Sequence, residues 1–95
     1  MIKQFELSKH ATERAEQRGF NAEIVKFVAR RGDIRKPALH GRRAVFLSDH
    51  QTDLLAARGV DFIFLESARR CLVVIARSGA VITVHDGARM TRTFN

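Results

Sequence analysis

Residues 71–85 decide the fold, and they read Cys-Leu-Val-Val-Ile-Ala-Arg-Ser-Gly-Ala-Val-Ile-Thr-Val-His. Two apolar runs rich in β-branched residues, 71–76 and 80–85, flank the connection Arg-Ser-Gly. β-Branched residues favour strands, and a short connection that contains glycine is typical of a β-hairpin. The stretch therefore predicts two antiparallel strands. Cys71 is expected to be a small buried apolar residue there, not a nucleophile.

Two helices are predicted upstream of this hairpin. Residues 9–18 contain no Gly, Pro, Val or Ile, and they lie between a good N-cap, Ser8, and a good C′ residue, Gly19. The second helix is expected to begin after Asn21 and to end at Gly32. Its buried stripe is expected to consist of Ile24, Val25, Val28 and Ala29.

The remaining segments are less regular. Further strands are expected at 2–7, 42–47 and 60–65, where apolar and polar residues alternate or β-formers gather. Residues 33–41 hold the only proline and are interpreted as a connection. The secondary structure of residues 48–58 is ambiguous, and a short helix capped by Ser48 is one alternative.

Length and element order indicate one domain. A chain of 95 residues suffices for a single core, so residues 1–95 are expected to form one domain, with a polar tail at 88–95 that frays. The predicted class is α+β, with two N-terminal helices packed on one face of a mainly antiparallel sheet of four to five strands.

The charge points to a polyanionic partner. Seventeen Lys and Arg against ten Asp and Glu give a net charge of +7, and most of the cations are Arg. A generally arginine-rich composition is the alternative, but the charge is uneven, because residues 49–68 are acidic between basic flanks. We expect RNA or another polyanion as partner. No apolar run approaches membrane-spanning length, so we expect a cytoplasmic protein without membrane contact.

The first predicted helix carries a ridge of three polar residues. His10, Arg14 and Arg18 are four residues apart, so they share one side of the helix, next to Ala11 and Ala15. A histidine there can act as a general base, and the two arginines can hold a phosphate. The alternative is structural: the arginines pair with carboxylates, and the histidine bonds a loop carbonyl.

The pattern Ser-Lys-His-Ala-x-x-Arg-x-x-x-Arg-Gly at 8–19 resembles the domain-of-unknown-function family 4258. The strands around Gly41-Arg42-Arg43 and at 81–84 also fit that family's layout. Members of the family are thought to resemble RelE-like and barnase-like ribonuclease toxins. The resemblance implies two helices on a four-stranded antiparallel sheet. It also implies metal-free RNA cleavage, with roles for His10, Arg14 and Arg18.

The end of the hairpin offers a second histidine. Period-two alternation places Thr83 and His85 on one face of the last strand, opposite Val84. If that face meets the first helix, His10 and His85 can form an acid–base pair across one phosphate. A solvated histidine at a strand end is the alternative. Contacts to nucleic acid are further assigned to Arg42, Arg43, Arg77, Thr83 and Arg89.

No metal site and no cofactor are expected. The four histidines lack close ligand spacing, and His50 with Asp53 is an i, i+3 pair of a kind that is more often a surface pair than a metal site. The leading hypothesis is a metal-independent, toxin-type endoribonuclease. Two alternatives remain open. One is a non-catalytic nucleic-acid-binding module, and the other is a toxin–antitoxin-type domain that binds an acidic protein.

Overall fold

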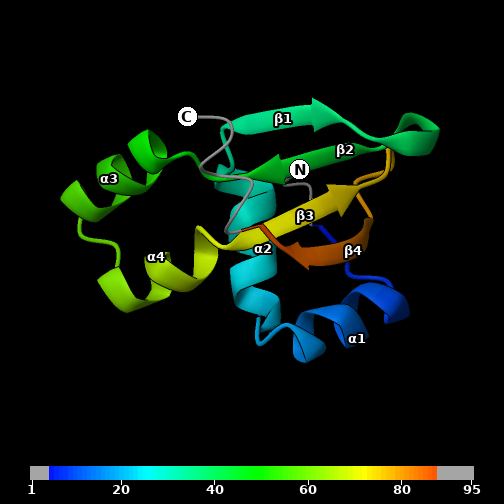
Figure 1. The fold of residues 1–95 in the computed structure, drawn as a ribbon, viewed down its shortest axis with the longest axis horizontal. Coiled ribbons are helices and arrows are strands. Elements are labelled where there is room, and N and C mark those ends of the chain that lie inside the picture. Colours follow the sequence, from blue (N-terminus) through cyan, green and yellow to red (C-terminus); the bar gives the residue numbers. More distant parts are fainter. Residues whose placement is uncertain (1–4, 88–95) are drawn as a thin grey trace.

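The fold is built on one four-stranded antiparallel sheet with strand order β1-β2-β3-β4 (Figure 1). The structure is a computed structural model and describes residues 5–87. The strands are β1 (Ile34–Pro37), β2 (Arg43–Phe46), β3 (Cys71–Ile75) and β4 (Val81–Asp86). The helices are α1 (Lys9–Gln17), α2 (Ala22–Arg31), α3 (Asp49–Ala57) and α4 (Phe62–Ala68), with a 3₁₀ turn η1 (Leu39–Gly41). The predicted α+β class, the hairpin and the antiparallel sheet are confirmed.

The core lies between α2 and the sheet. The predicted stripe of α2 is buried in full, against side chains that β2, β3 and β4 direct to the same face: Val45, Cys71, Val73, Ile75, Val81 and Val84. Because burial of apolar area is the main stabilising contribution to folding, this contact holds the sheet and α2 together. Cys71 is fully buried, as predicted.

The C-terminal end of α2 lies very close to β2. A Cβ atom at Gly32 would lie 2.4 Å from Val45 Cγ1 and 2.7 Å from the Val28 carbonyl oxygen. Gly32 therefore ends α2, as predicted, at a point where only glycine allows helix and strand to approach so closely.

α1 lies beside β4, at the edge of the sheet (Figure 1). Its predicted caps are present: Ser8 Oγ accepts a hydrogen bond from Ala11 N at 3.0 Å, and Gly19 has a φ of 81°. The segment before α1 pairs in parallel with Val81, through Val81 N to Glu6 O at 2.8 Å and Ser8 N to Val81 O at 3.0 Å. Of the strand expected at 2–7, the described residues 5–7 form only this isolated bridge at Leu7.

The prediction of a strand at 60–65 is wrong. This stretch leads into α4, whose N-cap Asp61 accepts a hydrogen bond from Phe64 N at 2.9 Å. Leu65 and Ala68, three residues apart, are buried, whereas Ile63 is 77% exposed. An aromatic-rich apolar run has strand propensity, but the cap and the helical spacing of the buried residues decide the outcome.

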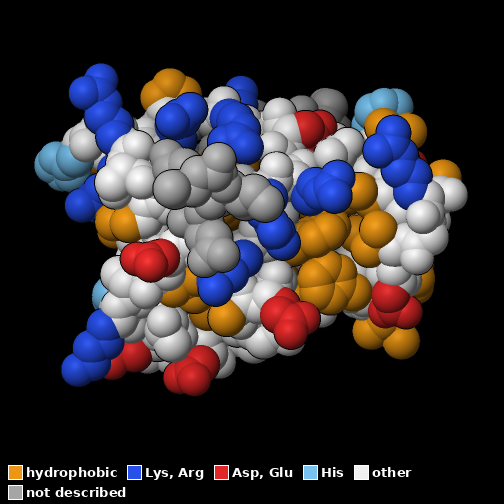
Figure 2. Space-filling model, turned by 180° about the vertical axis from the view of Figure 1, so that it is seen from behind, with side chains coloured by type: hydrophobic (Ala, Val, Ile, Leu, Met, Phe, Trp, Pro, Cys, Tyr) orange, Lys and Arg blue, Asp and Glu red, His pale blue; other side chains and the backbone are white. Residues whose placement is uncertain are grey.

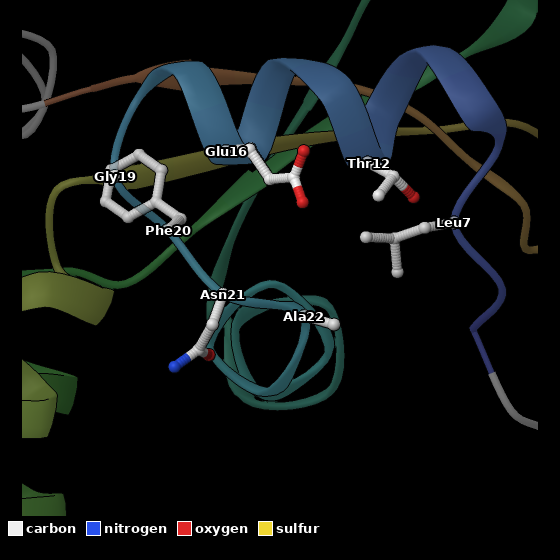
Figure 3. Close-up of a pocket in the computed structure, with 8 residues that line it drawn as sticks. Leu7, Thr12, Glu16, Gly19, Phe20, Asn21 and Ala22 are labelled. Carbon is white, nitrogen blue, oxygen red and sulfur yellow. The ribbon is translucent and has the colours of Figure 1, made fainter.

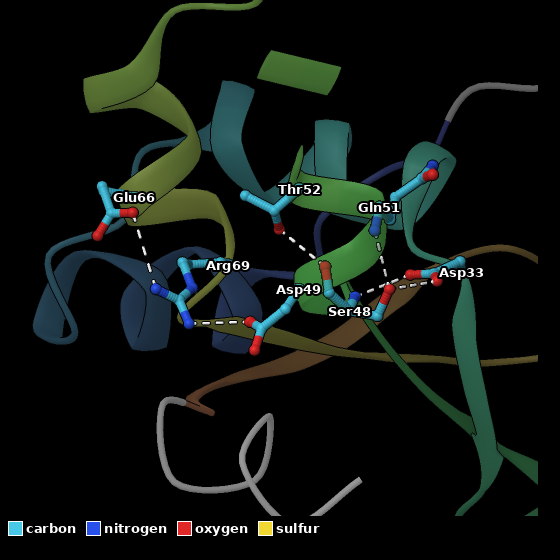
Figure 4. Close-up of polar contacts among 7 residues, drawn as sticks. All are labelled: Asp33, Ser48, Asp49, Gln51, Thr52, Glu66 and Arg69. Atoms are coloured by element: carbon cyan, nitrogen blue, oxygen red, sulfur yellow. Dashed lines mark hydrogen bonds and ion pairs between the residues drawn. The ribbon is translucent and has the colours of Figure 1, made fainter. Parts of the chain in front are cut away.

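Residues 48–58, for which the sequence left the structure undecided, contain α3. Ser48 is its N-cap, so the alternative of a short helix capped by Ser48 is confirmed. Asp33 holds this cap in place, because it accepts from Ser48 N at 2.8 Å and from Ser48 Oγ at 2.6 Å (Figure 4). Gln51 Nε2 donates to the Arg31 carbonyl at 2.9 Å, which ties α3 to the end of α2. Arg69 pairs with Asp49 at 2.9 Å and so links α4 to α3.

The interpretation of 33–41 as a connection is wrong for its first half. Residues 34–37 form β1, which pairs with β2 from Ile34 opposite Phe46 to Pro37 opposite Arg43. Most of β1 is exposed, so it lacks the apolar alternation that marks a strand in the sequence. Proline is tolerated there because β1 is an edge strand. The tail at 88–95, expected to fray, lies outside the described residues.

Substitution Gly32→Ala is expected to destabilise the fold by about 1–3 kcal/mol, because the added methyl group overlaps Val45 and the Val28 carbonyl. Urea unfolding followed by circular dichroism measures the change. An unchanged free energy of unfolding would contradict the close contact between α2 and β2.

Candidate functional site

The site begins with the two faces of β4. Val84 pairs with Val73 on the buried side, whereas Thr83 pairs with Val74 and His85 pairs with Leu72 on the opposite side. Thr83 is half-buried and His85 is exposed. The alternation of the sequence thus predicted correctly that Thr83 and His85 share the face that turns away from Val84.

α1 presents its polar ridge next to its buried alanines. Ala11 and Ala15 are 0% and 2% exposed and belong to the core that includes β4. His10 and Arg18 are exposed and Arg14 is half-buried. Since the alanines have short side chains, the helix lies close to β4 and carries the ridge toward the strand.

α1 packs against β4, so the charges of the ridge lie close enough to influence the strand. The pKa of His85 is lowered from its ordinary value of 6.5, first by partial burial and then by the charges of Arg18, Arg14 and His10. All three ridge residues are therefore close enough to act on this imidazole. The four residues assigned to catalysis from the sequence, which lie in two segments far apart in the chain, thus belong to the two elements α1 and β4 that pack together.

The ridge arginines have few protein partners. Arg14 Nη1 donates to Gln17 Oε1 at 3.5 Å, a long hydrogen bond. Within residues 5–87, neither Arg14 nor Arg18 forms an ion pair. The structural alternative, in which they pair with carboxylates, is not found in this part of the chain. Two guanidinium groups beside His85 can therefore take an anion from solution.

Asp86, which follows His85 in the sequence, lies on the other face of β4. Asp86 pairs with Arg70 at 2.6 Å and lies opposite Cys71 in the register. Burial, and then the charge of Asp86, raise the pKa of Cys71 to about 12. The thiol thus stays protonated at neutral pH, which agrees with a structural cysteine.

Among residues 5–87, the residues assigned to nucleic-acid contact lie in different parts of the fold. Thr83 lies with His85, and Arg89 falls outside the described residues. Arg42 closes the turn η1, where its carbonyl accepts from Ala38 N at 2.8 Å. Arg43 and Arg77 line a separate pocket of about 120 Å³.

Sequence reasoning missed a third arginine of that pocket, Arg35. It lies on β1, in the segment interpreted as a connection. The available signal was the pair Arg-Lys at 35–36 just ahead of a proline, which is a weak indication of an edge strand.

Two further pockets lack the chemistry of the ridge. One lies between α1 and α2, on the far side of α1 from the ridge, and its lining is mostly apolar apart from Thr12, Glu16 and Asn21 (Figure 3). The other lies between α3 and α4, where Arg69 is paired with Asp49. His50 and Asp53 do lie on a helix, but no group of three potential metal ligands forms among the described side chains.

Comparison with known proteins adds no relative: no family model, no curated protein and no solved structure matches the chain. None of the helices within residues 5–87 is long and apolar enough to cross a membrane.

Substitution Arg18→Gln is expected to raise the pKa of His85, because it removes the largest of the three charge effects that lower this pKa, whereas the effect of burial remains. Histidine titration by NMR measures the shift. Lys9→Gln, a charge loss on the exposed face of the same helix, is the matched control and should leave this pKa unchanged. Equal His85 titration in parent and Arg18→Gln would contradict this effect of the ridge charge.

The same lowered pKa has a consequence for stability. Because the folded protein binds the His85 proton more weakly than the unfolded chain, this group disfavours the folded state as the pH falls through 6.5. The acid-dependent loss of stability should be smaller in His85→Gln than in the parent, as measured by urea unfolding between pH 7 and pH 5. An identical pH dependence in the two proteins would contradict a lowered pKa.

Proposed function

We propose that the chain cleaves RNA at the site formed by His10, Arg14, Arg18 and His85, without needing a metal ion. The observation that carries this proposal is the packing of α1 against β4, which lets His10, Arg14 and Arg18 act on His85, while the two arginines have no carboxylate partner among residues 5–87. Imidazoles transfer protons near neutral pH, and guanidiniums bind phosphate oxygens in a bidentate manner. The net charge of +7 favours a polyanionic substrate.

The proposed reaction needs only these groups. His85, whose lowered pKa favours the neutral imidazole, takes the proton of a ribose 2′-hydroxyl. The 2′-oxygen bonds to the adjacent phosphorus, and the bond from phosphorus to the 5′-oxygen breaks. His10, for which the sequence suggested the role of base, here gives a proton to the departing 5′-oxygen, and a 2′,3′-cyclic phosphate remains. Arg14 and Arg18 stabilise the charge that builds up on the phosphorane oxygens.

The resemblance of residues 8–19 to the domain-of-unknown-function family 4258 supports the same proposal. This resemblance implies a RelE-like or barnase-like fold and metal-free cleavage of RNA. Thr83, on the same face as His85, is proposed to contact the substrate backbone.

The parent protein should cleave RNA in the presence of EDTA, and His85→Ala and His10→Ala should each lower the rate by about 10²–10⁴-fold. Arg14→Gln should lower it by about 10²–10³-fold, because one donor to the transition state is lost. Gel analysis of a labelled oligoribonucleotide measures the cleavage, and the 2′,3′-cyclic end identifies the reaction.

Exposed His50 on α3 provides the matched control, since His50→Ala removes an imidazole far from the site in the fold and should cleave like the parent. Circular dichroism confirms that each variant is folded. An inactive parent that still binds RNA with strong salt dependence would exclude the enzyme and favour a non-catalytic binding module.

That binding module is the second candidate function. It is favoured by Arg43 and Arg77, which lie together away from His85 and can bind phosphate without any chemistry. In this case charge loss at the arginines weakens binding, and loss of either histidine has little effect. Binding of an acidic protein instead of RNA is the outcome that fits the toxin–antitoxin alternative.

A further inference from the structure

A second cationic site lies at the end of the sheet where β2 begins and β3 ends. Its pocket, of about 120 Å³, is lined by three arginines from three different segments, together with Phe5, Val45, Ile75, Ala76 and Gly79. Arg35 comes from β1, Arg43 from β2 and Arg77 from the β3–β4 turn. No acidic residue of the described chain lines it.

The sheet register explains why these arginines meet. Arg43 pairs with Ile75, and Arg77 follows Ile75 by two residues. Arg35 pairs with Val45, so it lies diagonally across from Arg43 on the same face of β1 and β2. Diagonal neighbours in antiparallel strands are about 7–8 Å apart, within reach of long side chains. Backbone pairing therefore holds three positive charges around one small space.

The three cations are not neutralised by the described chain. Arg35 Nη2 donates to the Ala29 carbonyl at 3.3 Å, a contact with the last turn of α2 that helps to position its guanidinium. Arg43 and Arg77 form no ion pair within residues 5–87. Like charges held close together repel one another, and a bound anion removes this cost.

We propose that Arg35, Arg43 and Arg77 form a phosphate-binding pocket, separate from the His85 site, that holds a backbone phosphate of a bound polynucleotide. The pocket has a volume of about 120 Å³, so a small anion such as a phosphoryl group can enter it. Guanidinium groups match the phosphate oxygens in geometry as well as in charge.

The surroundings favour a long anion over a small one. The molecule is seen from the side of α2 in Figure 2, and most Lys and Arg side chains gather in the upper half of the view, with most Asp and Glu below them. A basic area broader than one pocket binds several phosphates of one chain better than a lone ion.

A short stretch of chain connects the pocket with the start of the ridge. Phe5 lines the pocket and precedes His10 by five residues, so the two Cα atoms are separated by no more than about 18 Å. One polynucleotide can therefore reach both places. The choice of a polynucleotide rests on the proposed function, whereas phosphate binding by the pocket does not.

The test uses an oligonucleotide with 2′-O-methyl groups, which can bind but cannot be cut by 2′-hydroxyl attack. The double variant Arg43→Gln with Arg77→Gln should bind it about ten-fold or more weakly, because charge-assisted hydrogen bonds are lost. The slope of log affinity against log salt should fall by about 0.7 for each lost phosphate contact with a single strand. Arg58→Gln, an exposed arginine at the end of α3, is the control and should bind like the parent.

A second measurement locates the phosphate. Inorganic phosphate should shift the backbone amide signals of Gly79 and Arg77 in NMR spectra of the parent and not in spectra of the double variant. Unchanged oligonucleotide binding together with unshifted amides would overturn the proposal. Shifted amides with unchanged oligonucleotide binding would overturn the polynucleotide assignment and leave a pocket for free phosphate or a mononucleotide.

These results are independent of catalysis. If the parent cleaves no RNA, but the double variant loses oligonucleotide binding and His85→Ala does not, the proposed enzyme fails and the pocket stands. If cleavage is real, the double variant should raise KM with little change in kcat, because it removes binding distant from the reacting atoms.

Discussion

The close contact of α1 with the edge strand β4 is the constraint on which the candidate site depends. Ala11 and Ala15 form the buried side of the helix, and their short side chains allow the two elements to approach. The pairing of Glu6 and Ser8 with Val81 fixes where the helix begins along the strand. Ser8 Oγ adds a donation to the Ile82 carbonyl at 3.2 Å, so the N-cap of α1 is itself bonded to β4. These hydrogen bonds and the packing of α1 on β4 keep His10, Arg14 and Arg18 on the side of the helix next to the strand that carries His85.

Much of this arrangement could be predicted because its signals are local. The caps Ser8 and Asn21, the C′ residue Gly19 and the glycine-containing hairpin each act over a few residues, and all are found as expected. The four-residue spacing of the ridge follows from helix geometry, and the face of His85 follows from strand alternation. That these two faces meet could only be stated as a condition, because it depends on a contact between residues more than 70 positions apart.

The failures have physical causes as well. β1 is an exposed edge strand, so its sequence needs no buried alternation, and Arg35 could not be placed without it. α4 was missed because Phe62, Ile63 and Phe64 have high strand propensity, while the decisive cap, Asp61, is a single residue. In both places the tertiary setting overrides the local pattern. The relation to the domain-of-unknown-function family 4258 remains a prediction, and so does the RelE-like or barnase-like fold that it implies.

Positive charge without matching carboxylates recurs in this molecule, at the α1–β4 site and at the end of the sheet. By contrast, Arg69 and Arg70 are paired with Asp49 and Asp86. Arginines that have no carboxylate beside them can bind an anion from solution, and the two proposals rest on this property.

The central claim is that α1 and β4 act on the same phosphate, and a double-mutant cycle tests it most directly. The affinity of an uncleavable 2′-O-methyl oligonucleotide would be measured for the parent, Arg18→Gln, His85→Gln and the double variant. We expect the two substitutions to be non-additive, because Arg18 is proposed to hold the phosphate beside His85 and its charge also acts on that imidazole. Additive effects, within about 0.5 kcal/mol, would show that the two residues act on separate parts of the ligand and would contradict the account.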